Sequence, residues 1–379
     1  MSVGKKIISF FLAGIVFCTV LSCLFPASAI SVSAGSAILI DAESGEILYS
    51  KNADKIRPMA STTKIMTAVI AIESGRLDEL CVITREAVGI EGSSIYLCEG
   101  ESLTLRQLVY ALMLSSANDA AAAIAVNCAG SIEKFAVMMN EKAEALGLTR
   151  THFDNPHGLD SDAHYTTAAD LAKLTAYALK LADFKAIVST YKAQIPMCGT
   201  ENGRLLVNHN KLLRTYKGIV GVKTGFTKKS GRCLVSAAER NGTVLIAVTL
   251  NAPDDWNDHR TMLDHGFENY RTVELTKDIS SLPFPVISGT KNEVRCAPSQ
   301  KLSVLLPKDH GPIVCRTEAK RFLFAPVEKG EKVGEIIFFC DGVEIGRAEL
   351  LAINTIELRR QKYTIWDNIL DFFTNKGLT

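Results

Sequence analysis

The stretch "PMASTTKIMTAVIAI", Pro58 to Ile72, constrains the fold more than any other segment of the chain. Between Ile65 and Ile72, Thr67 is the single polar side chain, so an α-helix here is apolar on nearly every side and belongs in a core. Lys64 stands at the start of this run, three residues after Ser61. Because burying an ammonium group is costly, a lysine in this position is expected to have a use.

The length and charge of the chain indicate which classes of protein it can belong to. Its 379 residues are 47% apolar and 22% charged, which is typical of a globular protein of two or more domains. The formal net charge is +1, and Lys5 and Lys6 in the first segment contribute to it. At the level of net charge the chain shows no nucleic-acid footprint, so nucleic acid is not expected as a partner.

Residues 1–29 have the pattern of a secretory signal peptide. Two lysines precede an uncharged stretch from Ile7 to Phe25, and Ala27-Ser28-Ala29 fits a cleavage site. An uncleaved membrane anchor and a lipoprotein-type box at Val20-Leu21-Ser22-Cys23 are the alternatives. All three place the remaining chain outside the cytoplasm, at the outer face of the cytoplasmic membrane or in the cell-wall space.

Eight of the ten cysteines follow this segment: Cys81, Cys98, Cys128, Cys198, Cys233, Cys296, Cys315 and Cys340. An even number in an exported protein is compatible with one or two disulfides. However, no CxxC pair occurs and the spacings are irregular, which favours buried thiols that act as small apolar fillers. The sequence does not pair them.

The hydrophobic pattern predicts an α+β fold for residues 30–275. A hairpin over 36–50 precedes the apolar helix, and Thr104 with Gln107 forms a capping box for a second helix. Further helices are predicted from Ala120, over 132–146 and over 166–181, and strands between 218 and 250. The pattern of residues 276–357 predicts short strands that form a small all-β domain. Residues 358–379 form an amphipathic pattern that favours a helix on a membrane surface, with docking on its own domain as the alternative.

Three short motifs occur in order along these elements. Ser61 and Lys64 form Ser-x-x-Lys at a helix start, Ser116-Ala117-Asn118 lies between two helices, and Lys223-Thr224-Gly225 ends a strand. Each is weak by itself, since Ser-x-x-Lys recurs elsewhere in the chain, for example at Ser189. In this order and on these elements, they are typical of penicillin-recognising serine acyl-transferases.

The chemistry of the first motif follows from its spacing. Ser61 and Lys64 lie on the same face of a helix. Burial disfavours the ammonium form, so the pKa of Lys64 can fall and its amine can accept a proton from the hydroxyl. The free N–H groups at a helix start are donors suited to an oxyanion hole. A helix cap with a lysine that extends into solvent is the structural alternative.

The chain resembles the low-molecular-weight penicillin-binding proteins, specifically the serine-type D-alanyl-D-alanine carboxypeptidases. The resemblance is carried by the three motifs, the "NPHGL…H" loop, the β-rich C-terminal part and the tail. The resemblance implies a penicillin-binding/β-lactamase-like catalytic domain, an antiparallel sheet with helices on both faces. It implies removal of the terminal D-alanine from peptidoglycan pentapeptides, no metal or cofactor, and β-lactam antibiotics as covalent inhibitors.

The resemblance also implies catalytic roles. Ser61 would attack the carbonyl of the penultimate D-alanine while an uncharged Lys64 takes its proton. Ser116 would pass a proton to the departing D-alanine amine, and water would then release the acyl-enzyme.

A second group of residues is implied to bind the substrate. Asn118 would hold the catalytic lysine and the substrate amide, and the backbone N–H of Phe226 would join that of the nucleophile in the oxyanion hole. Lys223 and Thr224 would bind the terminal carboxylate, while Gly225 lets the strand approach the substrate.

The sequence departs from the family where some members carry an arginine that helps to bind this carboxylate. The corresponding segment reads "PDDWNDHR", so Arg260 and Arg232 are both candidates. His157 and His164, in the polar loop, are expected to order that loop by hydrogen bonds rather than to transfer protons.

Two other functions share the motifs. A β-lactamase is disfavoured because no Glu-x-x-Leu-Asn segment stands between the second and third motifs, and because the β-rich domain and tail are unexpected for it. A scaffold or β-lactam sensor without turnover is disfavoured because every motif residue is intact.

Overall fold

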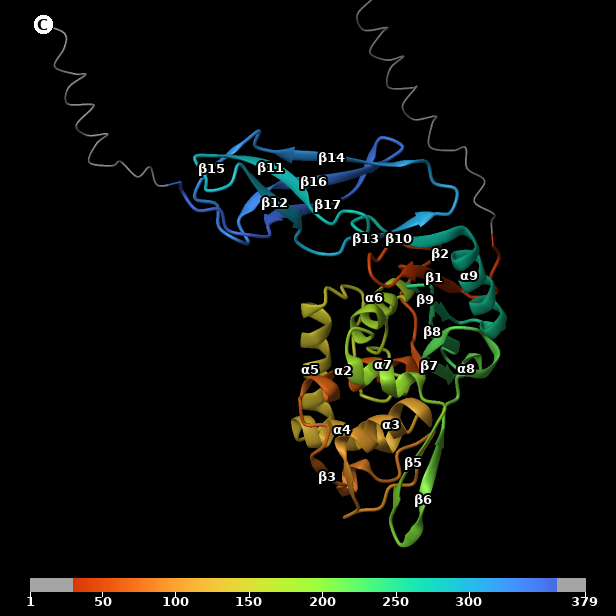
Figure 1. Cartoon of the computed structure of the whole chain (residues 1–379). Helices are drawn as coiled ribbons and strands as arrows, with labels where there is room; N and C mark the ends of the chain where they lie inside the picture. Colours follow the sequence, from red (N-terminus) through yellow and green to blue (C-terminus); the bar gives the residue numbers. More distant parts are fainter. Residues whose placement is uncertain (1–29, 360–379) are drawn as a thin grey trace, which may run out of the picture. The chain divides into compact units, whose positions relative to one another are not determined.

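The computed structural model describes residues 30–359 and divides into two units (Figure 1). The first unit extends to Ile40 and continues over Ile47–Ala238 and Leu245–His265. The second contains Asp41–Glu46, Glu239–Val244 and the chain from Gly266 onward. The predicted signal peptide, 1–29, and all but the first two residues of the predicted tail helix lie outside the described residues.

A five-stranded sheet with the order β2-β1-β9-β8-β7 forms the centre of the first unit. Its strands are β1 (Ser36–Asp41), β2 (Ile47–Lys51), β7 (Ile219–Thr227), β8 (Gly231–Arg240) and β9 (Thr243–Leu250). β1 pairs antiparallel with β2, and β7 with β8. β1, β8 and β9 are buried over most of their length, which accounts for their continuous apolar runs. β7 is an edge strand of this described sheet.

Helices cover both faces of the sheet, as predicted (Figure 1). The helices of the described residues are η1 (Ala60–Thr63), α2 (Lys64–Glu73), η2 (Arg85–Ala87), α3 (Leu105–Leu114), α4 (Asn118–Ala129), α5 (Ile132–Ala145), α6 (Ala168–Ala178), α7 (Ala182–Ser189), α8 (Leu212–Thr215) and α9 (Asp255–Asn269). In the first unit α2, α6 and α7 lie on one side of the sheet, and the part of α9 up to His265 lies on the other.

The helix predicted from the apolar run is present, with one correction at its start. Every residue of α2 from Lys64 to Ile72 is buried, as expected for a helix that is apolar nearly all round. Ser61, however, lies in the 3-10 turn η1 that precedes the α-helix. The capping box that starts α3 is confirmed: Thr104 Oγ1 accepts from the backbone N–H of Gln107, whose side chain accepts from the backbone N–H of Thr104.

Several elements of the first unit were not predicted. The helical pattern of 166–181 corresponds to α6, and a separate helix, α7, follows it. β5 (Lys192–Met197) and β6 (Thr200–Val207) form an antiparallel hairpin, and β3 (Leu80–Val82) pairs with β4 (Ser102–Thr104). Most residues of the β5–β6 hairpin are exposed or half-buried, so its sequence carries only a weak hydrophobic signal.

The second unit is all-β in its described part beyond α9, as predicted. Its strands are β10 (Tyr270–Glu274), β11 (Leu282–Ile287), β12 (Glu293–Pro298), β13 (Ser303–Pro307), β14 (Ile313–Ala319), β15 (Leu323–Phe324), β16 (Lys332–Cys340) and β17 (Val343–Ala352). Six of them form a sheet in the order β14-β16-β17-β12-β11-β15, and β10 pairs with β13. Val294, Phe338 and Leu350 are among the buried residues of its core.

Within residues 30–359, no single helix is long and apolar enough to cross a bilayer. α4 and α5 have the required length and composition only when taken together, and the pair is bent by 82°.

The eight cysteines of the described residues are free thiols with different environments. Four are buried, as predicted for apolar fillers: Cys81, Cys233, Cys296 and Cys340. Cys128 is half-buried, and Cys98, Cys198 and Cys315 are exposed. The filler prediction is therefore wrong for the three exposed cysteines.

Candidate active site

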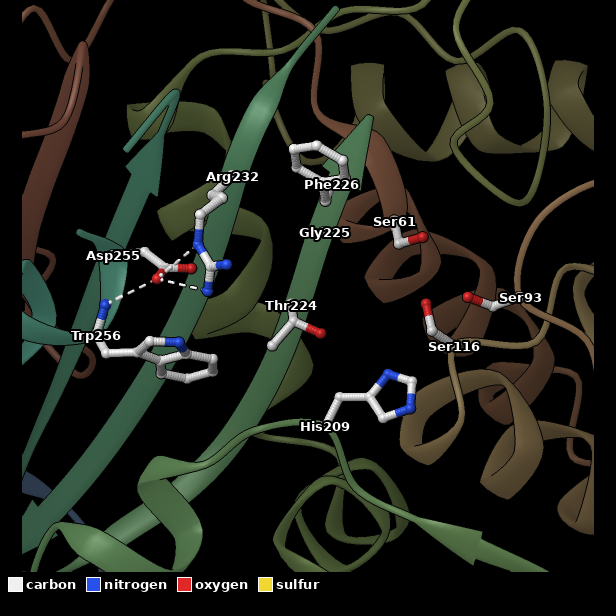
Figure 2. Close-up of a pocket in the computed structure, with 10 residues that line it drawn as sticks. All are labelled: Ser61, Ser93, Ser116, His209, Thr224, Gly225, Phe226, Arg232, Asp255 and Trp256. Carbon is white, nitrogen blue, oxygen red and sulfur yellow. Dashed lines mark hydrogen bonds and ion pairs between the residues drawn. The ribbon is translucent and has the colours of Figure 1, made fainter. Parts of the chain in front are cut away.

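The three motifs meet at one cleft of the first unit, with a volume of about 340 Å³ (Figure 2). Ser61 enters it from η1, Ser116 from the turn between α3 and α4, and Thr224 and Gly225 from β7. The cleft is lined by Ser61, Ser93, Ser116, His209, Thr224, Gly225, Phe226, Arg232, Asp255 and Trp256. Segments far apart in the sequence thus bring their polar groups to one place.

Lys64 is fully buried, with 0% of its surface exposed. Its Nζ lies 3.0 Å from Ser61 Oγ, 2.6 Å from Asn118 Oδ1 and 2.5 Å from the backbone oxygen of His157. The amine is therefore enclosed by three oxygens. The alternative of a lysine that extends into solvent is wrong for this residue.

These contacts suit the neutral form of the amine. Burial lowers the pKa of Lys64 well below its usual range, the positive charge of Lys223 lowers this pKa further, and Asp119 opposes the shift. A neutral amine has two N–H donors and one lone pair. The oxygens of Asn118 and His157 can accept the two donors, which leaves the lone pair for the hydroxyl proton of Ser61.

Gly158 lets the polar loop pack directly against the serine turn. Its φ is +91°, and a Cβ there would lie 2.0 Å from the carbonyl oxygen of Ala60 and 3.0 Å from the backbone nitrogen of Ser61. The loop is held by Asn155, whose Oδ1 accepts from the backbone N–H of Gly158 at 2.7 Å. A glycine is required here, and the close approach brings the carbonyl of His157 to the lysine.

The two loop histidines make the ordering contacts expected of them. His164 Nδ1 accepts from the backbone N–H of Asp154 at 3.0 Å, so its Nε2 carries the hydrogen and donates to Thr63 Oγ1 at 2.6 Å. Burial lowers the pKa of His164 to about 4 and that of His157 to about 3, so both are neutral at pH 7. The cleft-lining residues within 30–359 include neither imidazole.

The second motif sits in a strained turn. Ser116 is buried with a φ of +57°, in the left-handed region that non-glycine residues rarely adopt. Asn118 follows as the first residue of α4, and its Nδ2 donates to the backbone oxygen of Glu91 at 2.5 Å. Its backbone N–H donates to the oxygen of Ser93 at 2.7 Å. The turn is thus fixed to the loop that places Ser93 in the cleft.

Asp119 holds the next part of this loop. Its buried carboxylate accepts from the backbone N–H groups of Ile95 and Leu97, each at 3.1 Å, and from Ser94 Oγ at 2.6 Å. The start of α4 therefore positions the cleft-side loop through both a side-chain amide and a carboxylate.

The third motif lies on β7, against the serine turn. Lys223 is 2% exposed, and burial lowers its pKa to about 7. A Cβ on Gly225 would lie 3.0 Å from the backbone nitrogen of Ser61 and 3.2 Å from that of Thr62. Glycine is therefore the residue that allows the strand to approach the turn this closely. Phe226, 65% exposed, follows at the cleft.

The structure separates the two arginine candidates. Arg232, on β8, lines the cleft, pairs with Asp255 at 2.9 Å and lies 6.0 Å from the ring centre of Trp256 (Figure 2). Arg260, on α9, instead donates to the backbone oxygen of Thr215 at 3.0 Å and to its hydroxyl at 2.7 Å. Arg232 is the candidate that reaches the cleft.

Four cleft residues were not singled out from the sequence: Ser93, His209, Asp255 and Trp256. Burial, and then the charge of Lys223, lowers the pKa of His209. Trp256 is one of two tryptophans in the chain and lies within the segment "PDDWNDHR", so the rarity of the residue is a signal that the sequence offers. Ser93 and His209 carry no comparable pattern.

The comparison with protein families agrees with this geometry. The family described as "D-alanyl-D-alanine carboxypeptidase" matches residues 24–254, and "Penicillin-binding protein 5, C-terminal domain" matches residues 270–358. D-alanyl-D-alanine carboxypeptidase DacF of Bacillus subtilis (strain 168) is 32% identical over 365 residues, which cover 92% of this chain and 94% of that protein. DacC of Escherichia coli (strain K12) is 31% identical over 362 residues, with 90% and 88% covered.

Solved structures show the same architecture. Penicillin-binding protein 5 from Haemophilus influenzae has a TM-score of 0.71 at 27% identity, covering 87% of this chain and 99% of that one. Penicillin-binding protein 6B from Escherichia coli has a TM-score of 0.69 at 28% identity, covering 86% and 96%. Both the α+β fold class and the resemblance are confirmed. The chain belongs to the D-alanyl-D-alanine carboxypeptidase family, the serine-type peptidases among the low-molecular-weight penicillin-binding proteins.

Proposed function

We propose that Ser61 is the nucleophile with which this D-Ala-D-Ala carboxypeptidase releases the terminal D-alanine of peptidoglycan stem peptides. The observation that carries the proposal is the buried Nζ of Lys64, 3.0 Å from Ser61 Oγ. An amine whose pKa is lowered by burial can remove the hydroxyl proton at neutral pH, which an exposed lysine cannot do.

Acylation begins when the proton of Ser61 moves to Lys64 and Oγ attacks the carbonyl carbon of the penultimate D-alanine. The oxyanion is assigned to the backbone N–H groups of Ser61 and Phe226. The proton then passes through Ser116 to the nitrogen of the departing D-alanine. The C–N bond breaks, and the peptide remains as an ester on Ser61 until water releases it. Support comes from the two serine hydroxyls, which both enter the cleft (Figure 2).

The terminal carboxylate of the substrate is assigned to Lys223, Thr224 and Arg232. Lys223 supplies a cation in a buried position, Thr224 a hydroxyl, and Arg232 a guanidinium that lines the same cleft. Because Asp255 already pairs with Arg232, the guanidinium is held in one place before the substrate binds.

The rest of the peptide is assigned to the edge strand and the second motif. β7 is an edge strand of the described sheet, so an extended peptide can lie beside it, and Gly225 leaves room for its backbone. Asn118 uses its oxygen for Lys64 and one N–H for Glu91, which leaves the second N–H for a substrate carbonyl. β-Lactams resemble this peptide end and would stop at the ester with Ser61.

The experiment measures D-alanine release from diacetyl-L-Lys-D-Ala-D-Ala, together with labelling by fluorescent penicillin. Ser61→Ala and Lys64→Ala are expected to abolish release, and Ser61→Ala to abolish labelling as well. The matched controls are Ser189→Ala and Lys192→Ala, which alter another Ser-x-x-Lys pair of the same chain and should keep both activities. Circular dichroism checks that each variant is folded. Release of D-alanine by folded Ser61→Ala protein would refute the proposal.

We also propose that the chain is exported and that its tail binds the membrane surface. Support comes from the composition of residues 1–29 and from the amphipathic pattern of 358–379. N-terminal sequencing of protein recovered from outside the cytoplasm should begin at Ile30. A chain that ends at Arg359 should leave the membrane fraction, whereas the full chain should stay in it; equal distribution would argue against a role for the tail.

A further inference from the structure

Two exposed cysteines outside the three motifs come together on the first unit. Cys98 lies in the loop before β4, and Cys198 lies in the turn between β5 and β6. The Cys198 thiol is close enough to contribute to raising the pKa of the Cys98 thiol, although the two positions are far apart in the sequence. Both are exposed, so a small oxidant in solution can reach them.

A single buried carboxylate positions the two backbones. Glu101 Oε2 accepts from the backbone N–H of Cys98 at 3.1 Å, and Glu101 Oε1 accepts from the backbone N–H of Cys198 at 3.2 Å. Glu101 also forms an ion pair with Arg204 at 2.5 Å, in which 5% and 6% of the two side chains are exposed. Buried groups with this many partners have little freedom to move.

Arg204 ties the same two segments together from its other side. Its guanidinium donates to the backbone oxygen of Ile95 at 2.7 Å and to that of Tyr96 at 3.0 Å, both in the loop before Cys98. It also donates to the backbone oxygen of Pro196 at 2.8 Å, just before Cys198. Arg204 and Glu101 therefore join the segments that carry Cys98 and Cys198, so the two cysteines are held on neighbouring parts of the first unit.

We propose that Cys98 and Cys198 are a modification site at which a reversible disulfide forms on contact with a disulfide-type oxidant. One cysteine thiolate attacks the S–S bond of the oxidant, forms a mixed disulfide and releases one oxidant thiol. The other cysteine then attacks the protein sulfur of the mixed disulfide and releases the second oxidant thiol. Two protein thiols lose two protons and two electrons, and the oxidant is reduced to two thiols.

The setting and rate follow from the surroundings. Export to an oxidising compartment, proposed above, would supply the oxidant in the cell, but the chemistry itself does not depend on export. Desolvation, and then the hydrogen bond of Cys198, raises the pKa of the Cys98 thiol. Because the thiolate is the attacking form, the disulfide should form faster as the pH rises from neutral to mildly alkaline values.

The bond would secure the loop that positions the catalytic turn. This loop supplies the oxygens of Glu91 and Ser93 to Asn118, and its Ile95 and Leu97 bind Asp119. A covalent link from Cys98 to the β5–β6 hairpin would keep this loop from moving away from the hairpin. It would also lower the conformational entropy of the unfolded chain. Neither sulfur is among the described groups that line the cleft, so D-alanine release should persist in the oxidised form.

The test treats the purified chain with oxidised glutathione, blocks the remaining thiols by alkylation and maps non-reduced peptides by mass spectrometry. The expected result is a Cys98–Cys198 cross-linked peptide that dithiothreitol removes. Oxidation should also raise the Tm of the wild-type chain and of Cys315→Ser, which removes an exposed cysteine of the second unit. The Tm of Cys98→Ser and of Cys198→Ser should not rise.

Mapping in the wild-type chain needs no variant, so a serine variant that folds poorly does not affect the test. The proposal is overturned if both cysteines of the oxidised, folded chain are alkylated, if each carries its own glutathione adduct, or if the cross-link maps to another pair. These outcomes are independent of the catalytic proposal, which the D-alanine assay decides.

Discussion

Lys64 and Lys223 are both buried at the active site; burial lowers the pKa of Lys64, and the positive charge of Lys223 lowers it further. The proposed mechanism needs the two amines in opposite states, since Lys64 must be neutral to accept a proton and Lys223 must be charged to bind a carboxylate. Two like charges in a buried site disfavour double protonation, so the pair favours a single proton. Binding of the substrate carboxylate would favour the form in which Lys223 carries the proton and Lys64 is neutral.

The first prediction concerns the pH dependence of kcat/KM for the D-Ala-D-Ala peptide. At low pH Lys64 becomes protonated and activity falls; above about pH 7 Lys223 loses its proton and substrate binding weakens. The profile should therefore be bell-shaped from acidic to alkaline pH, with its alkaline limb near pH 7. Arginine stays charged over this range, so Lys223→Arg should keep the acid limb and lose the alkaline limb, at a lower maximum. An unchanged alkaline limb in Lys223→Arg would contradict the assignment.

The second prediction concerns stability. Burial lowers the pKa of Lys223 from 10.5 to about 7, so between these values the unfolded chain binds a proton that the native state does not. Stability from this group is therefore lost as the pH falls from 10.5 to about 7. Lys223→Met, similar in length but uncharged, should raise the free energy of unfolding at neutral pH by about 2 kcal/mol while reducing activity.

The free energy of unfolding of this variant is measured by urea unfolding at neutral pH and again at a pH just below 10.5, the usual pKa of lysine. The gain of Lys223→Met over wild type should shrink as the pH approaches 10.5. Lys228→Met serves as the control, because Lys228 is exposed in the turn after β7 and should show no such gain. A gain of equal size at both pH values would mean that the charge of Lys223 is not its cause.

The convergence of the motifs could be predicted because each lies at a strongly patterned element. Lys64 begins a helix that is apolar nearly all round, Thr104 marks the helix that leads into Ser116, and Gly225 lies two residues before the end of β7, where the sequence predicted the strand to stop. Such patterns depend on neighbouring residues and are visible in one sequence.

The remaining features depend on contacts between distant segments. Gly158 is one glycine among several in turns until the structure places it against the carbonyl of Ala60. Arg232 and Arg260 both stand in polar surroundings in the sequence, and the fold decides which of them faces the cleft. The β5–β6 hairpin, mostly exposed, is held through Arg204, whose partners Ile95 and Glu101 lie about a hundred positions earlier in the sequence. No local pattern records such contacts.

The third prediction concerns the close approach of the loop to the serine turn. Gly158→Ala adds a Cβ 2.0 Å from the oxygen of Ala60, so η1 must shift and the rate of acylation by penicillin should fall by about tenfold or more. Gly130→Ala is the matched control: its φ is +82°, but nothing lies within 4 Å of the added atom. Both variants bear a backbone strain of about 1 kcal/mol. If Gly130→Ala slows acylation as much as Gly158→Ala, the contact with η1 is not responsible.

The fourth prediction separates the hydroxyl of Ser116 from its backbone conformation. Ser116→Ala and Ser116→Gly both remove the proposed proton carrier, so each should lower kcat for D-alanine release by about 100-fold or more. The φ of +57° suits glycine better than alanine. The free energy of unfolding of Ser116→Gly should therefore exceed that of Ser116→Ala by about 0.5 to 1 kcal/mol. Steady-state kinetics and urea unfolding of the same preparations give both quantities. D-alanine release by Ser116→Gly at the wild-type rate would show that the backbone turn matters and that the hydroxyl does not carry the proton.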